Sequence, residues 1–566
     1  MDRTLRVIPA ARRQALALLL ALLGACAPAQ VAPPAPGPTP APAPTTPATP
    51  ATSPTPPEPD EAVGATPPSW WLLDRTADRY PGISADRAYA QLLAGRQPGD
   101  TVVVAIIDSG VDITHEDLRQ NVWTNPGEIA GNGRDDDGNG YVDDVHGWDF
   151  IGGPGGRDVE HDNLEVTRLY AALRGRCERA PARGECAEYP KIKADFEQHR
   201  AEAVQTLQQI RSMNEGYQRI TAVLQREIGT DSLTTERVDR IVSTSPQVEQ
   251  ARQIYLQLAE QGITPAEIER ERERVESRVE YGYNPDYDPR PIVGDDYADT
   301  SQRVYGNAEV IGPDAEHGTH VSGIVAARRG NGIGVDGIAP AVRIMVIRAV
   351  PDGDERDKDV ANAIRYAADN GARVINMSFG KGYSPRKDAV DAAVRHAESK
   401  GVLLVHAAGN DAADSDTTPN FPNRYYAGGG VARNWIEVGA SSQALASLAA
   451  NFSNYGRERV DVFAPGVDIR STVPGNRYNA ESGTSMAAPV VSGVAALLLA
   501  YYPELTAAQV KQIILDSATR YTDPVALPGS EGRTVPFAQL SATGGVVNVY
   551  AALEMAQRMA GAGGRN

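Results

Sequence analysis

Residues 481–502 read ESGTSMAAPVVSGVAALLLAYY, and the expected fold follows from this stretch. Ser482 to Thr484 favour a turn, and the apolar residues after them recur at three- and four-residue spacing, which predicts a helix buried on most sides. Pro489 lies about one turn into that helix, where its missing N–H costs little. Ser485 therefore stands at a helix N-terminus, where free N–H groups and the helix dipole stabilise an oxyanion. A helix cap without chemistry is the alternative interpretation.

Length and charge limit the classes to which this chain can belong. Its 566 residues are enough for roughly two to four domains and one large core. The net charge of −18 argues against a nucleic-acid partner, since phosphate binding requires a basic surface.

The N-terminal residues have the pattern of an export signal. Arginines precede an apolar core from Ala15 to Leu23 that is too short to span a membrane, so we expect residues 1–25 to be a signal peptide. The following LGAC resembles a bacterial lipobox, which predicts a lipid on Cys26 that attaches the chain to a membrane. Because no Asp follows Cys26, the outer membrane is favoured where the cell has two. Cleavage near Ala27 or Ala29 and secretion is the alternative.

Residues 26–69 are dominated by proline, alanine and threonine and show no apolar periodicity. A segment of this composition cannot form a core and is typical of a stiff polyproline-like tether. At about 3.1 Å per residue it reaches on the order of 120 Å, so we expect it to hold a folded domain away from a membrane.

From Trp70 onward the chain alternates between strand and helix patterns. Residues 101–107, TVVVAII, form an apolar run typical of a strand buried on both faces of a parallel sheet. The alternation predicts an α/β fold with a doubly wound, mostly parallel sheet built from residues 70–157 and 284–560. Further strands are expected at residues 343–349, 373–377, 402–407, 436–440 and 460–463, with helices at 86–93, 359–370 and 385–400 and one that begins at 317.

Residues 158–283 interrupt this alternation. They are rich in Glu, Arg, Gln and Ala, and their apolar residues keep a helical spacing. We expect an inserted α-helical subdomain of two to four helices, either a partner-binding arm or tolerated padding in a surface loop. Cys177 and Cys186 in this segment can form a disulfide in an oxidising compartment, with two free thiols as the alternative.

An acidic, glycine-rich loop precedes the insertion. Residues 131–144 read GNGRDDDGNGYVDD, and the spacing of their oxygen-bearing side chains is typical of a calcium-binding loop. The candidate ligands are Asp135, Asp137, Asn139 and Asp143. His146 stands where an EF-hand places its bidentate glutamate, so the loop is not a complete EF-hand. We expect a structural calcium ion here, with a solvated acidic turn as the alternative.

Four polar residues stand at the ends of predicted strands or helices: Asp108, His317, Asn410 and Ser485. These residue types supply what amide hydrolysis needs. Ser485 would be the nucleophile and His317 the base that takes its proton, while Asp108 orients the imidazole. The Asn410 amide and the backbone N–H of Ser485 would bind the oxyanion.

The sequences around these residues resemble the signature blocks of the subtilisin-like serine proteases. The blocks are IIDSGVD at 106–112, HGTHVSGIVAA at 317–327, AAGN at 407–410 and GTSMAAP at 483–489, in the family's order of Asp, His and Ser. The resemblance covers residues 70–155 and 285–558, and it implies a three-layer sandwich and an endopeptidase that cleaves polypeptides through an acyl-enzyme. In this chain the spacing from Asp108 to His317 is far longer than in the family, and no folding prodomain is evident before Trp70.

The resemblance also implies binding residues. Those expected to contact the substrate are Ser378, Phe379, Gly380, Ala408 and Gly409, and those of the family's strong calcium site are Asp117 and Asn331. The small residues that would wall the pocket imply a roomy pocket without a charged selector.

We therefore expect an exported, lipid-anchored serine endopeptidase with structural calcium, facing the periplasm or the exterior. A surface lipoprotein whose protease-like domain serves mainly for binding is the alternative, with residues 158–283 as the region that recruits a partner. The four filled catalytic positions favour the enzyme.

Overall fold

The computed structural model describes residues 66–181 and 184–563. The predicted signal peptide, Cys26 and all but the last residues of the 26–69 tether lie outside the described residues. The chain divides into a larger unit, Pro68–Asn214 with Thr264–Asn566, and a smaller unit that includes Glu215–Ile263.

A nine-stranded sheet forms the centre of the larger unit, in the order β12-β15-β9-β8-β7-β6-β1-β5-β2. Neighbouring strands are parallel except β12 and β15, which confirms the predicted mostly parallel sheet. The strands are β1 (Val102–Asp108), β2 (Gly147–Asp149), β5 (Val342–Arg348), β6 (Val374–Met377), β7 (Leu403–Ala407), β8 (Trp435–Ser441), β9 (Val462–Pro465), β12 (Thr519–Arg520) and β15 (Gly545–Val546). Short antiparallel ribbons pair β3 (Gly152–Gly153) with β4 (Arg157–Asp158), β10 (Ile469–Val473) with β11 (Arg477–Glu481), and β13 (Pro524–Ala526) with β14 (Thr534–Pro536).

Strand β1 lies between β5 and β6 and is buried on both faces, as its continuous apolar run predicts. Val104 and Ile106 belong to the apolar cluster on one face of the sheet, whereas Ala105 and Ile107 belong to the cluster on the other. Because side chains alternate along a strand, a strand with two buried faces needs apolar residues at every position.

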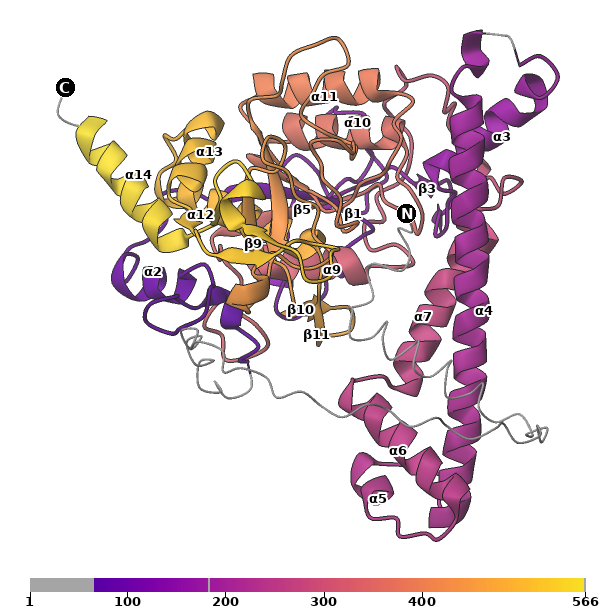
Figure 1. The fold of residues 1–566 in the computed structure, drawn as a ribbon. Helices are drawn as coiled ribbons and strands as arrows, with labels where there is room; N and C mark the ends of the chain where they lie inside the picture. Colours follow the sequence, from indigo (N-terminus) through magenta and orange to yellow (C-terminus); the bar gives the residue numbers. More distant parts are fainter. Residues whose placement is uncertain (1–65, 182–183, 564–566) are drawn as a thin grey trace, which may run out of the picture. The chain divides into compact units, whose positions relative to one another are not determined.

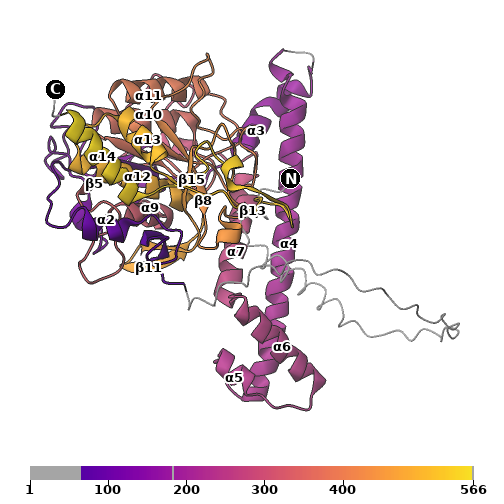
Figure 2. The same ribbon diagram turned by 60° about the vertical axis from the view of Figure 1, so that its left-hand side comes forward.

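Helices cover both faces of the sheet (Figures 1 and 2), which gives the expected three layers. Helices α9 (Glu316–Ala326) and α12 (Thr484–Tyr501) pack against one face, and α10 (Asp357–Asp369) and α11 (Lys387–Ser399) against the other. In the part of the chain that the structure describes, the remaining α-helices outside the insertion are α2 (Ala85–Gln91), α8 (Arg290–Val293), α13 (Ala507–Asp516) and α14 (Val549–Gly563).

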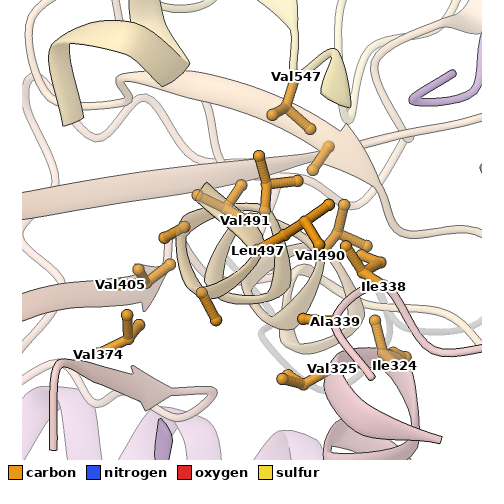
Figure 3. Close-up of a cluster of buried hydrophobic side chains, with 14 of the residues drawn as sticks. Ile324, Val325, Ile338, Ala339, Val374, Val405, Val490, Val491, Leu497 and Val547 are labelled. Carbon is orange, nitrogen blue, oxygen red and sulfur yellow. The ribbon is translucent and has the colours of Figure 1, made fainter. Parts of the chain in front are cut away.

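Helix α12 lies within the larger cluster of buried side chains, as Figure 3 shows. Val490, Val491 and Leu497 of the helix pack in one cluster with Val374 of β6 and Val405 of β7. By length and composition α12 could cross a membrane, but 89% of it is buried inside the protein, so core packing accounts for its apolar character. This burial confirms the helix predicted from residues 481–502 and fixes the position of its N-terminus.

The described part of residues 158–283, which lacks 182–183, contains five α-helices, so the expected two to four is wrong. They are α3 (Glu165–Cys177), α4 (Tyr189–Ile228), α5 (Thr235–Asp239), α6 (Pro246–Glu260) and α7 (Pro265–Ser277). Apolar spacing alone does not separate short consecutive helices, whereas Thr234 and Thr264 cap new helix starts through their hydroxyl groups. Cys177 and Cys186 form a disulfide, with their Cα atoms 5.5 Å apart, at the junction of α3 and α4.

Candidate active site

Asp108 is the last residue of β1, and its side chain is buried at the carboxyl edge of the sheet. Its Oδ1 accepts a hydrogen bond from the backbone N–H of Ser109 at 2.8 Å and lies 2.7 Å from Nδ1 of His317. Its Oδ2 is buried without a hydrogen-bond partner in the described chain. Asp108 is therefore a desolvated carboxylate that interacts with one imidazole.

His317 lies in the first turn of α9, and its approach to β1 depends on the glycine that follows it. A Cβ atom at Gly318 would lie 2.1 Å from the carbonyl oxygen of Gly110, so no larger residue allows the helix so close to the strand end. Burial by itself lowers the pKa of His317, but the charge of Asp108 and the hydrogen bond to it outweigh burial and raise the pKa to about 9.

Ser485 is the second residue of α12 and is half-buried. Its hydroxyl donates a hydrogen bond to the carbonyl oxygen of Ser378 at 3.0 Å. Among the described residues the hydroxyl has no hydrogen bond to His317, so the expected contact between nucleophile and base is not made in this structure. Such contacts often form only in the substrate complex.

The side-chain amide of Asn410 and the backbone nitrogen of Ser485 both lie close to Gly483. The Asn410 Oδ1 accepts hydrogen bonds from the backbone N–H and the hydroxyl of Thr484, at 2.8 Å and 2.9 Å, which fixes the orientation of the amide. A Cβ atom added at Gly483 would lie 3.5 Å from both Nδ2 of Asn410 and the backbone nitrogen of Ser485. Two N–H donors near each other, at the N-terminus of a helix, are of the kind that can stabilise a negatively charged oxygen.

A cavity of about 330 Å³ lies beside Ser485. Five of the predicted residues line it: Ser378, Phe379, Gly380, Gly409 and Asn410. Ala408 does not line the cavity, because its side chain is fully buried in an apolar cluster with Leu448 and Phe463.

The insertion also lines this cavity, which the sequence analysis missed. Its contributions are Leu164, Arg274, Ser277, Arg278 and Gly282, and the neighbouring loop adds Asp352, Gly353 and Asp354. The cavity therefore contains charged groups besides the small residues from which a pocket without a charged selector was expected. No local sequence pattern indicates these contacts, because the residues are far from Ser485 in sequence. The charged residues of the insertion are also typical of an ordinary solvent-exposed helix face.

A buried ion pair holds the insertion beside the cavity. Lys381, which follows the cavity residues Phe379 and Gly380, is buried, and its Nζ lies 2.9 Å from the Glu165 carboxylate of α3. Arg168 contacts the same carboxylate at 2.7 Å. Burial alone raises the pKa of Glu165, but the charges of Arg168 and Lys381 outweigh burial and lower this pKa to about 2. Such burial and pairing do not fit an insertion that is mere padding.

The acidic loop brings three carboxylates together, although they are not the predicted set. The carboxylate oxygens of Glu128, Asp137 and Asp144 lie within 4.8 Å of one another, and Oε2 of Glu128 is buried without a partner in the described chain. The other predicted ligands bind within the loop: Asp135 accepts from backbone N–H groups of Gly138, Asn139 and Gly140, Asp143 from those of Asn132 and Gly133, and Asn139 donates to Asp137 and Asp144.

Asp117 and Asn331, the residues expected at the family's strong calcium site, are in contact. The Asn331 side-chain amide donates to Asp117 Oδ1 at 2.6 Å, and the backbone N–H of Val335 donates to Oδ2 at 3.2 Å. Both carboxylate oxygens of Asp117 already accept protein donors, so this pair by itself adds no sign of a bound cation.

The carboxyl edge of the parallel sheet thus carries a carboxylate–imidazole pair and a serine on a helix N-terminus, the arrangement found in the α/β class of serine hydrolases. Comparison with known proteins identifies the family within this class. The model of the subtilase family matches residues 99–534, more than half of the chain, so the chain belongs to the subtilase family.

The relatives found by sequence are proteases. The chain is 43% identical over 225 residues to a thermophilic serine proteinase of a Bacillus species, covering 40% of this chain and 50% of that protein. It is 38% identical over 229 residues to a thermostable alkaline protease of Halalkalibacterium halodurans, covering 39% of this chain and 59% of the relative. The chain thus spans little more than half the length of these two relatives. A solved structure described as proteases from Pseudoalteromonas arctica matches 87% of this chain and all of its own, at 19% identity and a TM-score of 0.44.

Proposed function

We propose that this chain is a serine endopeptidase that hydrolyses polypeptides with Ser485 as the nucleophile, His317 as the base and Asp108 as the partner of the imidazole. The observation that carries the proposal is the 2.7 Å contact between Asp108 and His317 Nδ1. Because the buried carboxylate holds the proton on Nδ1, Nε2 is left as the basic nitrogen. Membership in the subtilase family supports the same assignment.

In this mechanism Ser485 attacks the carbonyl carbon of the peptide bond while Nε2 of His317 accepts the hydroxyl proton. The oxygen that becomes negative binds the Asn410 side-chain amide and the backbone N–H of Ser485. His317 then gives its proton to the leaving amine, and a water molecule, activated by the same imidazole, hydrolyses the acyl-enzyme. Asp108 stabilises the imidazolium and does not itself need to take a proton.

A fluorophosphonate probe, which labels activated serines, tests this proposal on the full chain. We expect the wild type to be labelled and to cleave an unfolded protein such as casein, and Ser485→Ala to do neither while keeping its circular dichroism spectrum. Asn410→Ala should keep labelling but lose about 10²–10³-fold in turnover, a magnitude known from a subtilisin rather than obtained from this structure. A folded wild type that is neither labelled nor active would contradict the proposal and favour a binding role.

A structural calcium ion held by Glu128, Asp137 and Asp144 is also proposed. The donor set fits, because three carboxylates approach one another and one of their buried oxygens lacks a partner in the described chain. A hard cation would neutralise these charges and link the two ends of the acidic loop. Metal analysis should find calcium that Asp137→Asn loses, with a lower melting temperature. Equal metal content in both proteins would argue against this site. Calcium at Asp117 and Asn331 stays a prediction.

Export and attachment to a membrane through a lipid on Cys26 are proposed from the sequence around that cysteine. The Cys177–Cys186 disulfide supports export, since disulfides persist in oxidising compartments. Cell fractionation tests the anchor: the wild type should stay with the membrane fraction, and Cys26→Ser should move to the soluble or secreted fraction. The same distribution for both proteins would refute it.

A further inference from the structure

Arg278 brings a guanidinium group whose Nε is unpaired to the active-site cavity. It is the first residue of η5 (Arg278–Gly282), a π-helical segment directly after α7, and it lines the same cavity as Ser485. Its Nε is buried without a hydrogen-bond partner, and none of the ion pairs in the described chain includes Arg278. A guanidinium N–H that has lost water without gaining an acceptor is unfavourable until a ligand supplies one, while the rest of this half-buried side chain remains partly solvated.

The neighbouring charged groups of the cavity already have partners. They are Arg274, 2.7 Å from Glu271; Lys381, 2.9 Å from Glu165; Asp352, 2.9 Å from His161; Asp354, which accepts the backbone N–H of Glu165 at 2.8 Å; and Asp411, a further carboxylate of the lining that also has an interaction partner. Asp352 also accepts a hydrogen bond from the Ser277 hydroxyl. Arg278 therefore remains as the cation of this cavity that has no acidic partner among the described residues.

The backbone that carries Arg278 is firmly attached to the start of the insertion. The carbonyl oxygen of Gly282 accepts hydrogen bonds from the backbone N–H of Leu164 at 3.0 Å and from the Thr167 hydroxyl at 2.7 Å. Tyr281 stacks on His161, with the ring centroids 4.2 Å apart. π-Helical segments are rare and recur at functional sites. The guanidinium is thus presented from a fixed backbone rather than from a loose surface turn.

An arginine at this position also has a purely structural explanation, which differs from binding of a ligand. A cation in the last turn of a helix is favoured by the helix dipole, and the Arg278 guanidinium lies 5.8 Å from the ring centroid of Tyr283. These contacts explain an arginine at a helix end. They do not explain why its Nε is buried without an acceptor at the wall of the cavity that contains Ser485.

We propose that Arg278 determines specificity by binding the carboxylate of a Glu or Asp side chain in the polypeptide substrate, on the acyl side of the scissile bond. This inference rests on the proposed endopeptidase function. The side follows from the lining of the cavity, which includes Ser485 and the expected substrate contacts Ser378 to Gly380 but not His317, towards which the amine of the cleaved bond leaves. A guanidinium matches a carboxylate with two parallel hydrogen bonds, which a neutral amide side chain cannot reproduce.

Hydrolysis of matched peptides tests the inference. Peptides that differ only by Glu or Gln are compared at each of the four positions before the cleaved bond. The wild type should prefer Glu at one position by about tenfold in kcat/KM, as expected for one charge-assisted contact that is partly exposed to solvent. Arg278→Gln should abolish the preference, Arg278→Lys should keep part of it, and Arg278→Glu should favour Lys at that position. Arg270→Gln, on the exposed side of α7 and outside the cavity, is the control and should keep the wild-type preference.

Binding to the Ser485→Ala variant separates this inference from the proposed function. Fluorescence anisotropy with the same labelled peptides should show the same preference for Glu without any hydrolysis. A protein that binds the Glu peptide selectively but never hydrolyses it would refute the proposed function and leave the assignment of Arg278 standing. Equal kcat/KM for Glu and Gln at all four positions, or a preference that persists in Arg278→Gln, would overturn the assignment of Arg278.

Discussion

Replacing Glu165 by Gln tests whether the buried ion pairs of the insertion stabilise the folded protein. The Glu165 side chain is buried, 2.9 Å from Lys381 Nζ and 2.7 Å from Arg168 Nη2. The substitution keeps the size of the side chain but leaves two buried cations with one anion fewer. Removing one partner of a buried ion pair typically costs about 3–5 kcal/mol.

The size of the effect also follows from the pKa of Glu165. Burial alone raises this pKa, yet the charges of Arg168 and Lys381 outweigh burial and lower it from 4.5 to about 2. The difference between these values corresponds to about 3 kcal/mol of unfolding free energy at neutral pH. Because the pKa is lower in the folded state, this stabilisation is complete above about pH 4.5 and is lost as the pH falls towards 2.

Urea denaturation of the wild type and Glu165→Gln at neutral and acidic pH measures this contribution. We expect Glu165→Gln to lose about 3 kcal/mol at pH 7, and the difference between the two proteins to shrink below pH 4.5. Glu197→Gln on α4 is the matched control, since Glu197 is 58% exposed and 3.8 Å from Lys193, and it should lose less than about 1 kcal/mol. A loss in Glu165→Gln no larger than that of the control would refute the reasoning.

Two further predictions concern the imidazole and the disulfide. Because His317 must be neutral to accept a proton, kcat/KM of the wild type should rise with pH through a pKa of about 9. Asp108→Asn removes the charge that raises this pKa and should shift the rise in kcat/KM to lower pH. A rise near pH 6.5 in both proteins would argue against the pairing of Asp108 with His317. The Cys177→Ser/Cys186→Ser variant should lose about 2–3 kcal/mol of unfolding free energy, as the chain-entropy estimate gives for a short loop. An unchanged urea midpoint in that variant would contradict this estimate.

The sheet and the four catalytic candidates were predictable because each is accompanied by a recognisable pattern in the adjacent residues. The apolar run of β1 reports burial on two faces, and Gly318 beside His317 reports a close approach of two backbones. No such local pattern accompanies Glu128 or Arg278. Glu128 joins the acidic cluster only after the loop folds back on it, and Arg278 reaches the cavity only because buried charges hold the insertion there. Interactions of this kind depend on tertiary packing, which spacing along the chain does not report.

The position of the insertion has a consequence for biosynthesis. Strand β1 ends up between β5 and β6, but the first residue of β5 leaves the ribosome roughly 240 residues after its partner Val102. At about 5–20 residues per second, the nascent chain carries an apolar strand with two open edges for roughly 10–50 s. Such a segment is a template for aggregation, whereas the helices of the insertion make local contacts and can fold in the interval. Correct folding therefore requires that the strand ending in Asp108 is kept from pairing wrongly until the second half of the chain has been made.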